Sequence, residues 1–346
     1  MRKKIKGISI MICLCLLLAG CSKSQTNIEN LNPGKPSIEN ESASELFEDD
    51  SSRGSMGMFS YGIVAPNEER QVYEYSGKEL HIPFKVSGLD KEVSSKFGLL
   101  VFVDGISQPY SIEHKNRDAS EVSVMHQFSL ENEESDEFDI VFNPVTGHKG
   151  DRIGVVFATI LQPEYKPQNA NQPNYGMNHS LSATVFQEID MKSDAPGQKE
   201  LHSYSDALVE DISQEIKDHA QNIITDGSSD YLDENVLTEL LPQDKEQNNI
   251  YTKNGQALFR FRIYGGLEAT YRTTFYINNK PIQINGADYI ESTTKKGKMS
   301  TVEIELDTSA YEELNSIYAI STVTGQDYLS ATNSPVKTKS MLLVNK

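Results

Sequence analysis

Residues of the types that perform catalysis are scattered along this chain. A hydrolase needs a nucleophile beside a base, or a metal ion with an open coordination position. The sequence has no HExxH motif, no GxSxG elbow and no P-loop, and its histidines show neither HxH nor HxxxH spacing. His126 lies in phase with apolar neighbours, which is typical of a hydrogen-bonded core or edge histidine. We therefore predict no catalytic residue and no enzyme activity, with a cell-envelope hydrolase as the weakest alternative. The seven histidines are His81, His114, His126, His148, His179, His202 and His219.

Two acidic clusters have oxygen atoms that calcium prefers. Ca²⁺ takes roughly 6–8 oxygen ligands, and loops between strands can supply them. Neither cluster matches the EF-hand loop, so a solvated acidic turn is the favoured interpretation, and we predict no metal and no cofactor. The clusters are Glu131, Glu133, Glu134, Asp136 and Glu137, and then Asp226, Asp230, Asp233 and Glu234.

The N-terminus has the charged and then apolar pattern of a secretory signal. Arg2, Lys3, Lys4 and Lys6 precede an apolar run over residues 8–18. At ~1.5 Å per residue this run spans about 17 Å, against about 30 Å for the hydrocarbon core of a bilayer. The run is therefore too short for a transmembrane helix, and we predict a signal peptide over residues 1–20.

Leu18-Ala19-Gly20-Cys21 follows the apolar run directly. This tetrapeptide resembles the lipobox of bacterial lipoproteins. The resemblance covers about twenty residues, and it implies diacylglyceryl attachment to the Cys21 thiol and cleavage between Gly20 and Cys21. Cys13 and Cys15 fall in the removed part, so Cys21 has no disulfide partner. Since two acyl chains give stable attachment, we expect a lipid-anchored protein on the extracytoplasmic face of the cell membrane.

Residues 21–55 are rich in Asn, Glu, Ser, Pro and Gly and lack a periodic apolar pattern. Such a segment cannot bury enough apolar surface to offset its ordering entropy, so we predict a flexible tether of roughly 30–35 Å mean length. The whole chain has 32 basic and 50 acidic residues and a net charge of -18. This charge disfavours polyanions, and we predict no nucleic-acid partner.

From Met58 onward, apolar and polar residues alternate with a period of two, which indicates half-buried strands. Leu80, Ile82, Phe84 and Val86 share one face, and Pro83 predicts a free strand edge nearby because it lacks an amide hydrogen. The run over 153–161 is apolar on both faces and predicts a central strand. Further strands are predicted over residues 99–103, 122–130, 138–142 and 181–186.

The order of these signals occurs twice. Phe259-Phe261-Ile263 repeats the phase of Ile82-Phe84-Val86, and 275–279 matches 101–105, where Asn-Asn and Asp-Gly suit tight hairpins with positive φ. We predict a mainly β fold with two tandem antiparallel β-sandwich domains of immunoglobulin-like architecture, and two unrelated β-domains are the alternative. The other matches are 138–142 with 302–306, Ile153 with Ile317 and Thr159 with Thr322 to within one position at an offset of 164, and 181–186 with 341–344.

The predicted domains cover residues 56–191 and 232–346, and residues 192–231 form a connector with one helix. Ser203 with Asp206 resembles a capping box, and Asp226-Gly227 suits a helix stop. These signals predict a helix of about eighteen residues that packs its apolar stripe on one sandwich, with a partner-binding helix as the alternative. The stripe is Leu208, Ile212, Ile216, Ala220 and Ile223.

Tyr165 and Tyr175 bracket a loop over residues 163–178 that is longer than a sandwich requires. Loops on rigid scaffolds commonly carry recognition, and tyrosine offers apolar area with a polar tip. We therefore predict that this loop contacts a partner. The absence of tryptophan weakens a carbohydrate-stacking interpretation.

The anchor, the tether, the repetition and the missing catalytic motifs together predict a function. We expect a non-catalytic binding or adaptor module that contacts another protein at the cell surface. A small-ligand or calcium-binding surface receptor is the alternative.

Overall fold

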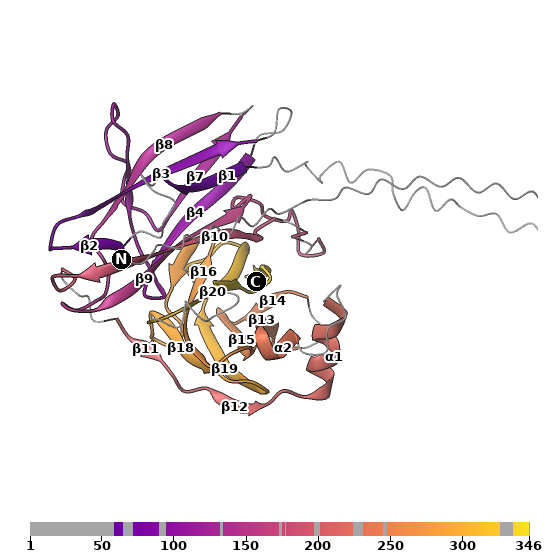
Figure 1. Ribbon diagram of the computed structural model, residues 1–346. Coiled ribbons are helices and arrows are strands. Elements are labelled where there is room, and N and C mark those ends of the chain that lie inside the picture. The colour runs from indigo at the N-terminus through magenta and orange to yellow at the C-terminus, as the bar shows by residue number, and fades with distance from the viewer. Residues whose placement is uncertain are drawn as a thin grey trace, which may run out of the picture. The chain divides into compact units, whose positions relative to one another are not determined.

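The described part of the chain is mainly β, as the alternating apolar residues predicted. All of it belongs to one contact unit, Ser55–Lys346. The predicted signal peptide and tether, with Gly20 and Cys21, lie outside the described residues. In Figure 1 the strands coloured indigo to magenta gather on one side and those coloured orange to yellow on the other, and we call these the first half (59–196) and the second half (201–345). The computed structural model describes residues 59–64, 72–89, 95–131, 134–172, 175–176, 178–196, 201–223, 231–244, 248–325 and 335–345.

The first half contains two sheets packed on a shared core. One sheet has the order β1-β3-β8-β6, and the other has the order β2-β10-β9-β4-β5, with β7 also paired to β4. Ile82, Phe84 and Val86, at alternate positions of β3, are fully buried in the core. The strands are β1 (Phe59–Ile63), β2 (Val72–Tyr75), β3 (Leu80–Gly88), β4 (Ser95–Val103), β5 (Ile106–Ser107), β6 (Ser111–Glu113), β7 (Met125–Leu130), β8 (Ser135–Phe142), β9 (Arg152–Leu161) and β10 (Leu181–Met191).

Two local predictions about these strands are confirmed. The run that is apolar on both faces is β9, which lies between β10 and β4 and is buried from Ile153 to Ile160. Pro83 lies in β3 at the point where pairing with β1 stops, because the last β1 pair is Ile63 with Phe84. The side of Pro83 that lacks an amide hydrogen therefore coincides with the end of the neighbouring strand.

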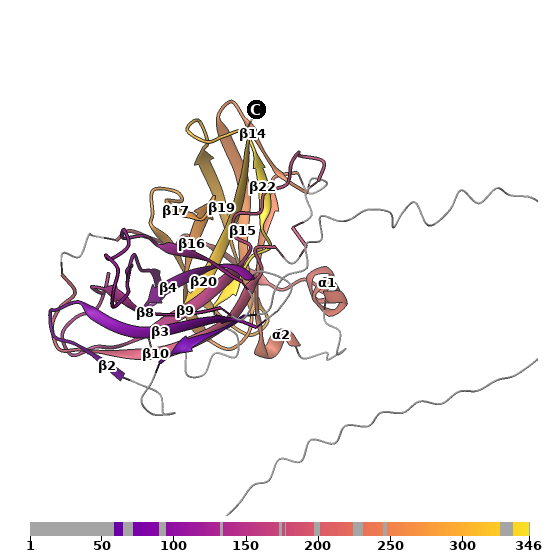
Figure 2. The same cartoon turned by 90° about the horizontal axis from the view of Figure 1, so that it is seen from above.

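In the second half, hydrogen bonds join the strands into one continuous sheet, because β14 pairs with both β22 and β15. Figure 2 shows these three strands side by side. The strands enclose a second core, in which Phe259, Phe261 and Ile263 of β15 are buried. The strands are β13 (Val236–Pro242), β14 (Ile250–Lys253), β15 (Gln256–Gly265), β16 (Ala269–Ile277), β17 (Lys280–Ile282), β18 (Tyr289–Thr294), β19 (Lys298–Asp307), β20 (Leu314–Val323), β21 (Val336–Lys337) and β22 (Met341–Val344).

The strand pairings of the first half recur in the second. The antiparallel pairs β1–β3, β3–β8, β4–β5, β4–β7, β4–β9 and β9–β10 correspond in order to β13–β15, β15–β19, β16–β17, β16–β18, β16–β20 and β20–β22. In each half an early strand also pairs in parallel with the last one, β2 with β10 and β14 with β22. The predicted matches of 82–86 with 259–263 and of 138–142 with 302–306 agree with each other, since Phe84 pairs with Phe138 and Phe261 pairs with Val302.

The predicted alignment of Ile153 with Ile317 is wrong by two residues. Val103 and Ile277 each precede a hairpin turn, and they pair with Val155 and Ile317 respectively. Val155 is therefore the counterpart of Ile317. A shift of two keeps every side chain on its own face of the strand, so an apolar run gives no signal against it.

The predicted match of the closing strands holds for the strands, and differs in the residues of β10 that take part. Gln187 pairs with Val155 and Met341 pairs with Ile317, so the later part of β10, rather than residues 181–186, corresponds to β22.

Both predicted hairpin turns are confirmed. Asp104 and Gly105 join β4 to β5 with φ of 48° and 77°, and Asn278 and Asn279 join β16 to β17 with φ of 47° and 64°. Positive φ at both central residues is the requirement of a type I′ turn, which Asp, Asn and Gly meet at the lowest steric cost.

The connector begins with two strands, which the sequence analysis did not predict. β11 (Ser203–Tyr204) pairs with β18, and β12 (Leu208–Asp211) pairs with β19. The helix α1 (Gln214–Ile223) is consequently shorter than predicted, and α2 (Tyr231–Glu234) is a single turn. Without β11 and β12, the strands β18 and β19 would leave backbone groups unpaired at the sheet edges. The local apolar pattern of the connector contains no information about such distant edges.

Because α1 begins only at Gln214, two residues assigned to the predicted helix have other roles. Leu208 lies in β12 with an exposed side chain, and Ser213 rather than Ser203 caps α1 by accepting the amide of Ile216 at 3.3 Å. Ile212 and Ile216 do pack on the second half, next to Tyr264. The predicted stop at Asp226-Gly227 lies outside the described residues. Neither helix of the described part is long and apolar enough to cross a membrane.

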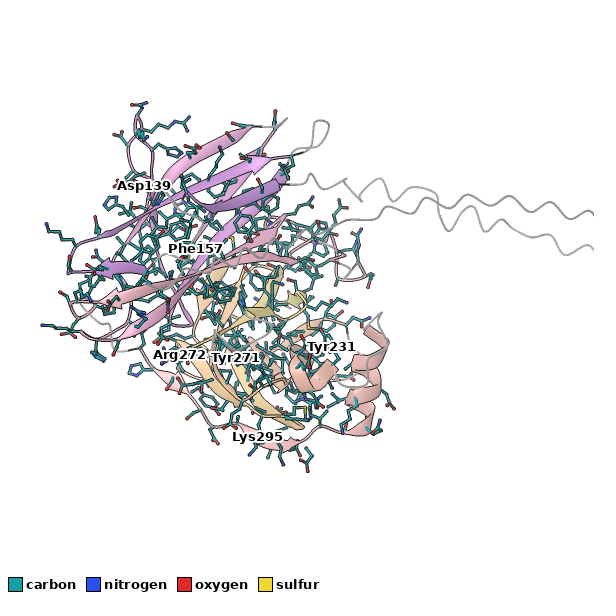
Figure 3. All side chains as sticks on the ribbon, in the orientation of Figure 1. Asp139, Phe157, Tyr231, Tyr271, Arg272 and Lys295 are labelled. Carbon is teal, nitrogen blue, oxygen red and sulfur yellow. The ribbon has the colours of Figure 1, made fainter. Side chains whose placement is uncertain are left out.

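A third apolar cluster joins the two halves. At its edge Asp104 accepts hydrogen bonds from the Arg272 guanidinium and from the Gly325 amide, both at 2.7 Å. Figure 3 labels Arg272 beside Tyr271 of the second core, with Phe157 of the first core above them. We call the cluster with these polar contacts the junction; its apolar members are Leu100, Phe102, Met125, Val156, Ala158, Ile160, Tyr276, Tyr318 and Ile320.

Candidate functional site

The loop between β9 and β10 reaches the second half. Tyr175, predicted to contact a partner, is only 2% exposed. Its ring meets that of Tyr165 edge-on at 5.7 Å, and its hydroxyl donates to the carbonyl oxygen of Met341 at 3.4 Å. Leu342 and Val344 of β22 complete this cluster. Both tyrosines therefore pack against the chain's own second half, and the buried Tyr175 presents no side-chain surface to another protein.

Beside this loop lies a pocket of about 290 Å³. The first half lines it with Tyr175, Gly176 and residues 178–181, and the second half with residues 337–340. The lining side chains include two lysines, Lys337 and Lys339, and no carboxylate. A chain with 50 acidic and 32 basic residues has therefore formed a pocket with an excess of basic groups.

Lys337 is half-buried as a residue, and neighbouring groups enclose its amine. Its Nζ donates to the carbonyl oxygen of Thr338 at 3.0 Å and to the Ser340 hydroxyl at 2.9 Å, and it lies 4.4 Å from the centre of the Tyr318 ring. No carboxylate of the described residues forms an ion pair with it. Burial without a counter-charge lowers the pKa of Lys337 from 10.5 to about 7.

His179 lines the pocket near Lys337, since both side chains contact the Ser340 hydroxyl. It is 1% exposed, has a φ of 57°, and its Nδ1 lies 3.3 Å from the Ser340 hydroxyl. Histidine tolerates the left-handed backbone region better than most residues do. Burial, and secondarily the charge of Lys337, lower the pKa of His179 from 6.5 to about 4. The imidazole is therefore neutral at physiological pH.

The arrangement suits binding better than catalysis. The Ser340 hydroxyl lies between two bases, which is a known way to activate a nucleophile. However, Ser340 is only 4% exposed, and no carboxylate of the described residues orients the His179 ring. What the pocket offers is an amine, a hydroxyl and the rings of Tyr175 and His179 around a small space.

Of the residues that line this pocket, Tyr175 was the one that the sequence pattern marked as functional. His179 was counted among the isolated histidines, and Lys337 and Ser340 belong to a short polar stretch with no recognised motif. Long-range packing alone brings the two segments together. The one available signal was the proximity of His179 to the long loop that contains Tyr175.

Three members of the two acidic clusters form ion pairs with basic side chains. Asp136 contacts His114 at 3.0 Å, Glu137 contacts Lys85 at 3.0 Å, and Asp233 contacts Lys296 at 2.7 Å. Glu133, Asp226 and Asp230 lie outside the described residues. Within the described ranges, no three His, Cys, Asp or Glu side chains are grouped as a metal site would require.

His126 matches its prediction as a hydrogen-bonded edge histidine. It lies in β7, and its Nε2 is 2.9 Å from the Tyr110 carbonyl oxygen, with the two rings 4.7 Å apart. Burial lowers the pKa of His126 below its usual value. The prediction of a hydrogen-bonded histidine at this position is confirmed.

Solved structures resemble the chain only weakly. The fibronectin(III)-like modules of Clostridium thermocellum CbhA are 10% identical with a TM-score of 0.21, over 83% of this chain and 94% of that one. The Salmonella enterica SafA pilin in complex with the SafB chaperone is 10% identical with a TM-score of 0.20, over 83% and 96%. A chaperone–tip adhesin complex of CFA/I fimbriae gives 9% identity and 0.19, over 77% and 93%. TM-scores this low carry no argument about function.

No family model and no curated protein matches the chain. Its own geometry therefore defines its class, a mainly β protein with two cores and a pocket where its halves meet.

Proposed function

We propose that the mature chain is a lipid-anchored binding or adaptor module without catalytic activity, held on the extracytoplasmic face of the cell membrane. Leu18-Ala19-Gly20-Cys21 supports the anchor, and the composition of residues 21–55 supports the tether. The observation that carries the binding role is the junction, because it fixes two β halves to each other as a rigid scaffold of the kind that recognition surfaces use.

In this proposal the two halves are copies of one β-sandwich of immunoglobulin-like architecture. The recurring strand pairings support it, as does the shared register at Phe84–Phe138 and Phe261–Val302. The parallel pairing of an early strand with the last strand is a further feature that both halves share. Two unrelated β-domains would not be expected to share both these strand pairings and this register.

The packing at the junction supports duplication independently. The pair Phe102–Val156 on β4 and β9 corresponds to the pair Tyr276–Tyr318 on β16 and β20, and all four residues lie in the junction. Matching faces of the two halves therefore contact each other.

Polar contacts are exchanged across the junction in the same way. Asp104, in the first hairpin turn, accepts the amide of Gly325 just past β20, and Asn279, in the second, donates to the carbonyl oxygen of Pro163 just past β9, at 2.8 Å. Reciprocal contacts of this kind mark an isologous interface between like subunits. We infer that the junction is such an interface retained within one chain.

Metabolic labelling with palmitate tests the anchor. We expect the label on the wild-type protein and its loss in Cys21→Ala, together with release of that variant from the membrane fraction. Cys13→Ala and Cys15→Ala are the matched controls, since both lie in the part that is removed. An unlabelled wild-type protein, or membrane retention of Cys21→Ala, would contradict the proposal.

Site-specific photo-crosslinking in intact cells tests the binding role. Val209, in edge strand β12, and Val122, in the first half, are suitable positions because their side chains are 61% and 70% exposed. We expect one protein to be captured reproducibly from one position and not the other, and only when Cys21 is intact. If neither position yields an adduct, the adaptor proposal loses its support.

A small-ligand receptor is the second candidate function, and the pocket beside Lys337 favours it. The calcium version of this candidate predicts a higher melting temperature in millimolar calcium than in EDTA. An unchanged melting temperature would exclude a calcium site that stabilises the folded chain.

A further inference from the structure

We infer that the pocket lined by Tyr175, Gly176, residues 178–181 and residues 337–340 binds a small oxyanion, a carboxylate or phosphate group, through Lys337, Lys339 and Ser340. This inference goes beyond the proposed adaptor role. It does not depend on the lipid anchor or on a protein partner.

The charge balance of the pocket is the first reason to expect an anionic ligand. Buried cations in proteins are normally paired, because desolvation of an unpaired charge is costly. The enclosed amine of Lys337 has only neutral partners among the described residues, namely the Thr338 carbonyl, the Ser340 hydroxyl and the Tyr318 ring. Other lysines of this chain do find carboxylates, as Lys298 does with Asp211 at 2.7 Å and Lys192 with Asp190 at 2.6 Å. The missing negative charge at Lys337 is what a bound anion would supply.

The unused hydrogen-bonding capacity of the Lys337 ammonium is the second reason. A lysine ammonium has three donors, and the contacts of Lys337 with Thr338 and Ser340 use two of them. Lys339, exposed at the same pocket, adds a second positive charge beside it. Charge-assisted hydrogen bonds to an oxyanion are roughly twice as strong as neutral ones, so this pairing favours an anionic ligand over a neutral polar one.

The dimensions of the pocket restrict the ligand. Its volume of about 290 Å³ lies at the lower end of the range of small-molecule sites, roughly 300–1,000 Å³. Tyr175, His179 and Leu181 give it apolar and aromatic walls. A free phosphate ion or a short-chain carboxylate fits within this volume. Of an acidic polymer, only the terminal group would fit.

Binding should be coupled to proton uptake. The pKa of Lys337 is lowered to about 7 by burial alone, and a bound anion would raise it again. Affinity is therefore expected to fall as the pH rises above about 7, where the empty site has lost its proton. The other titratable groups around Lys337 are Lys339, His179, Tyr165, Tyr175 and Tyr318. Burial raises the pKa of Tyr175 and of Tyr318, so these two hydroxyls stay neutral in this range.

Isothermal titration of the mature chain tests the inference. The chain carries Cys21→Ser, which removes the acylation site, and the probes are sodium phosphate and sodium acetate, with sodium chloride at equal ionic strength as the reference. We expect one phosphate or one acetate per chain and a matching rise in melting temperature. Binding of phosphate alone would identify a phosphate site, and binding of acetate alone a carboxylate site.

Lys337→Met and Lys96→Met form the matched pair of variants. Lys96 lies on β4 with an exposed side chain and does not line the pocket. Lys337→Met should weaken binding by about tenfold or more, whereas Lys96→Met should leave it unchanged. Lys337→Met removes an unpaired buried cation, so it should melt no lower than the wild type and thereby remain testable. No binding by the wild type, or equal binding by Lys337→Met, would overturn the inference.

Discussion

Residues with positive φ lie at tight turns of the chain, and only some of these turns are crowded by other parts of the molecule. Gly105 has a φ of 77°, and a Cβ there would lie 3.0 Å from the Thr322 carbonyl oxygen and 3.1 Å from the Arg272 Cβ. Gly255 has the same place in the β14–β15 hairpin and a φ of 76°, but nothing lies within 4 Å of its Cβ position. The two glycines thus separate the cost of backbone conformation from the cost of crowding.

Gly105→Ala should therefore destabilise the fold more than Gly255→Ala. The left-handed conformation costs alanine roughly 1–2 kcal/mol at either position. Crowding against the second half should add about 1–3 kcal/mol at Gly105 only. Denaturant unfolding of both variants measures the difference, and equal losses would show that the junction yields readily at this point.

His179 should make the protein sensitive to mild acid. Its pKa is about 4 in the folded state and 6.5 without burial, so the unfolded chain binds the proton more readily. Stability from the neutral ring is thus fully present above pH 6.5 and is lost as the pH falls toward 4, by roughly 3 kcal/mol. His179→Asn keeps a residue suited to positive φ and should remove this dependence, as measured by urea unfolding at several pH values. His148→Asn, at a side chain 72% exposed, is the control and should retain it.

At the scale of elements, alternation predicted strands well because a side chain's face depends only on its position along the strand. β3 and β15 bury the residues whose phase matched, and both type I′ hairpins lie at the predicted dipeptides. The connector was predicted less well. Its apolar spacing resembled a helix from Leu208 onward, but pairing with β19 made the first residues a strand.

The helix boundary at Ser213 has a measurable consequence. Ser213→Ala removes the hydroxyl that accepts the Ile216 amide, and loss of an N-cap costs about 1 kcal/mol. We expect faster hydrogen exchange at Ile216 and Lys217, with the sheets unaffected. Ser205→Ala, in the exposed stretch between β11 and β12, should leave the exchange unchanged. Equal effects of the two variants would place the helix start elsewhere.

At the scale of the whole molecule, the junction makes two cores behave as one folding unit. Its apolar members include Phe102, which is fully buried although it faces away from the first core. Arg272 of β16 forms an ion pair with Asp104 in the hairpin of the first half, and a second ion pair with Glu291 in β18 of its own half. The wild type should therefore unfold in a single calorimetric transition.

Phe102→Ala should separate this transition into two. It leaves a cavity between the halves and costs about 3–5 kcal/mol of their contact. Phe157→Ala makes a cavity of similar size inside the first core and should lower stability without removing the junction. Scanning calorimetry of both variants distinguishes them, and a single transition in Phe102→Ala would mean that the other residues of the junction keep the halves coupled.

Local sequence was enough to predict the long strands at the centre of each half, the apolar face of these strands and two of the tight turns, because each depends on neighbouring residues. The tertiary structure decided the register of the apolar strands, the strands of the connector and the meeting of matching faces at the junction. It also brought His179 beside Lys337 and Ser340, although no local pattern marked any of the three. The physical reason is that a two-residue shift, a free sheet edge and an enclosed amine are properties of contacts between distant segments, which local periodicity does not report.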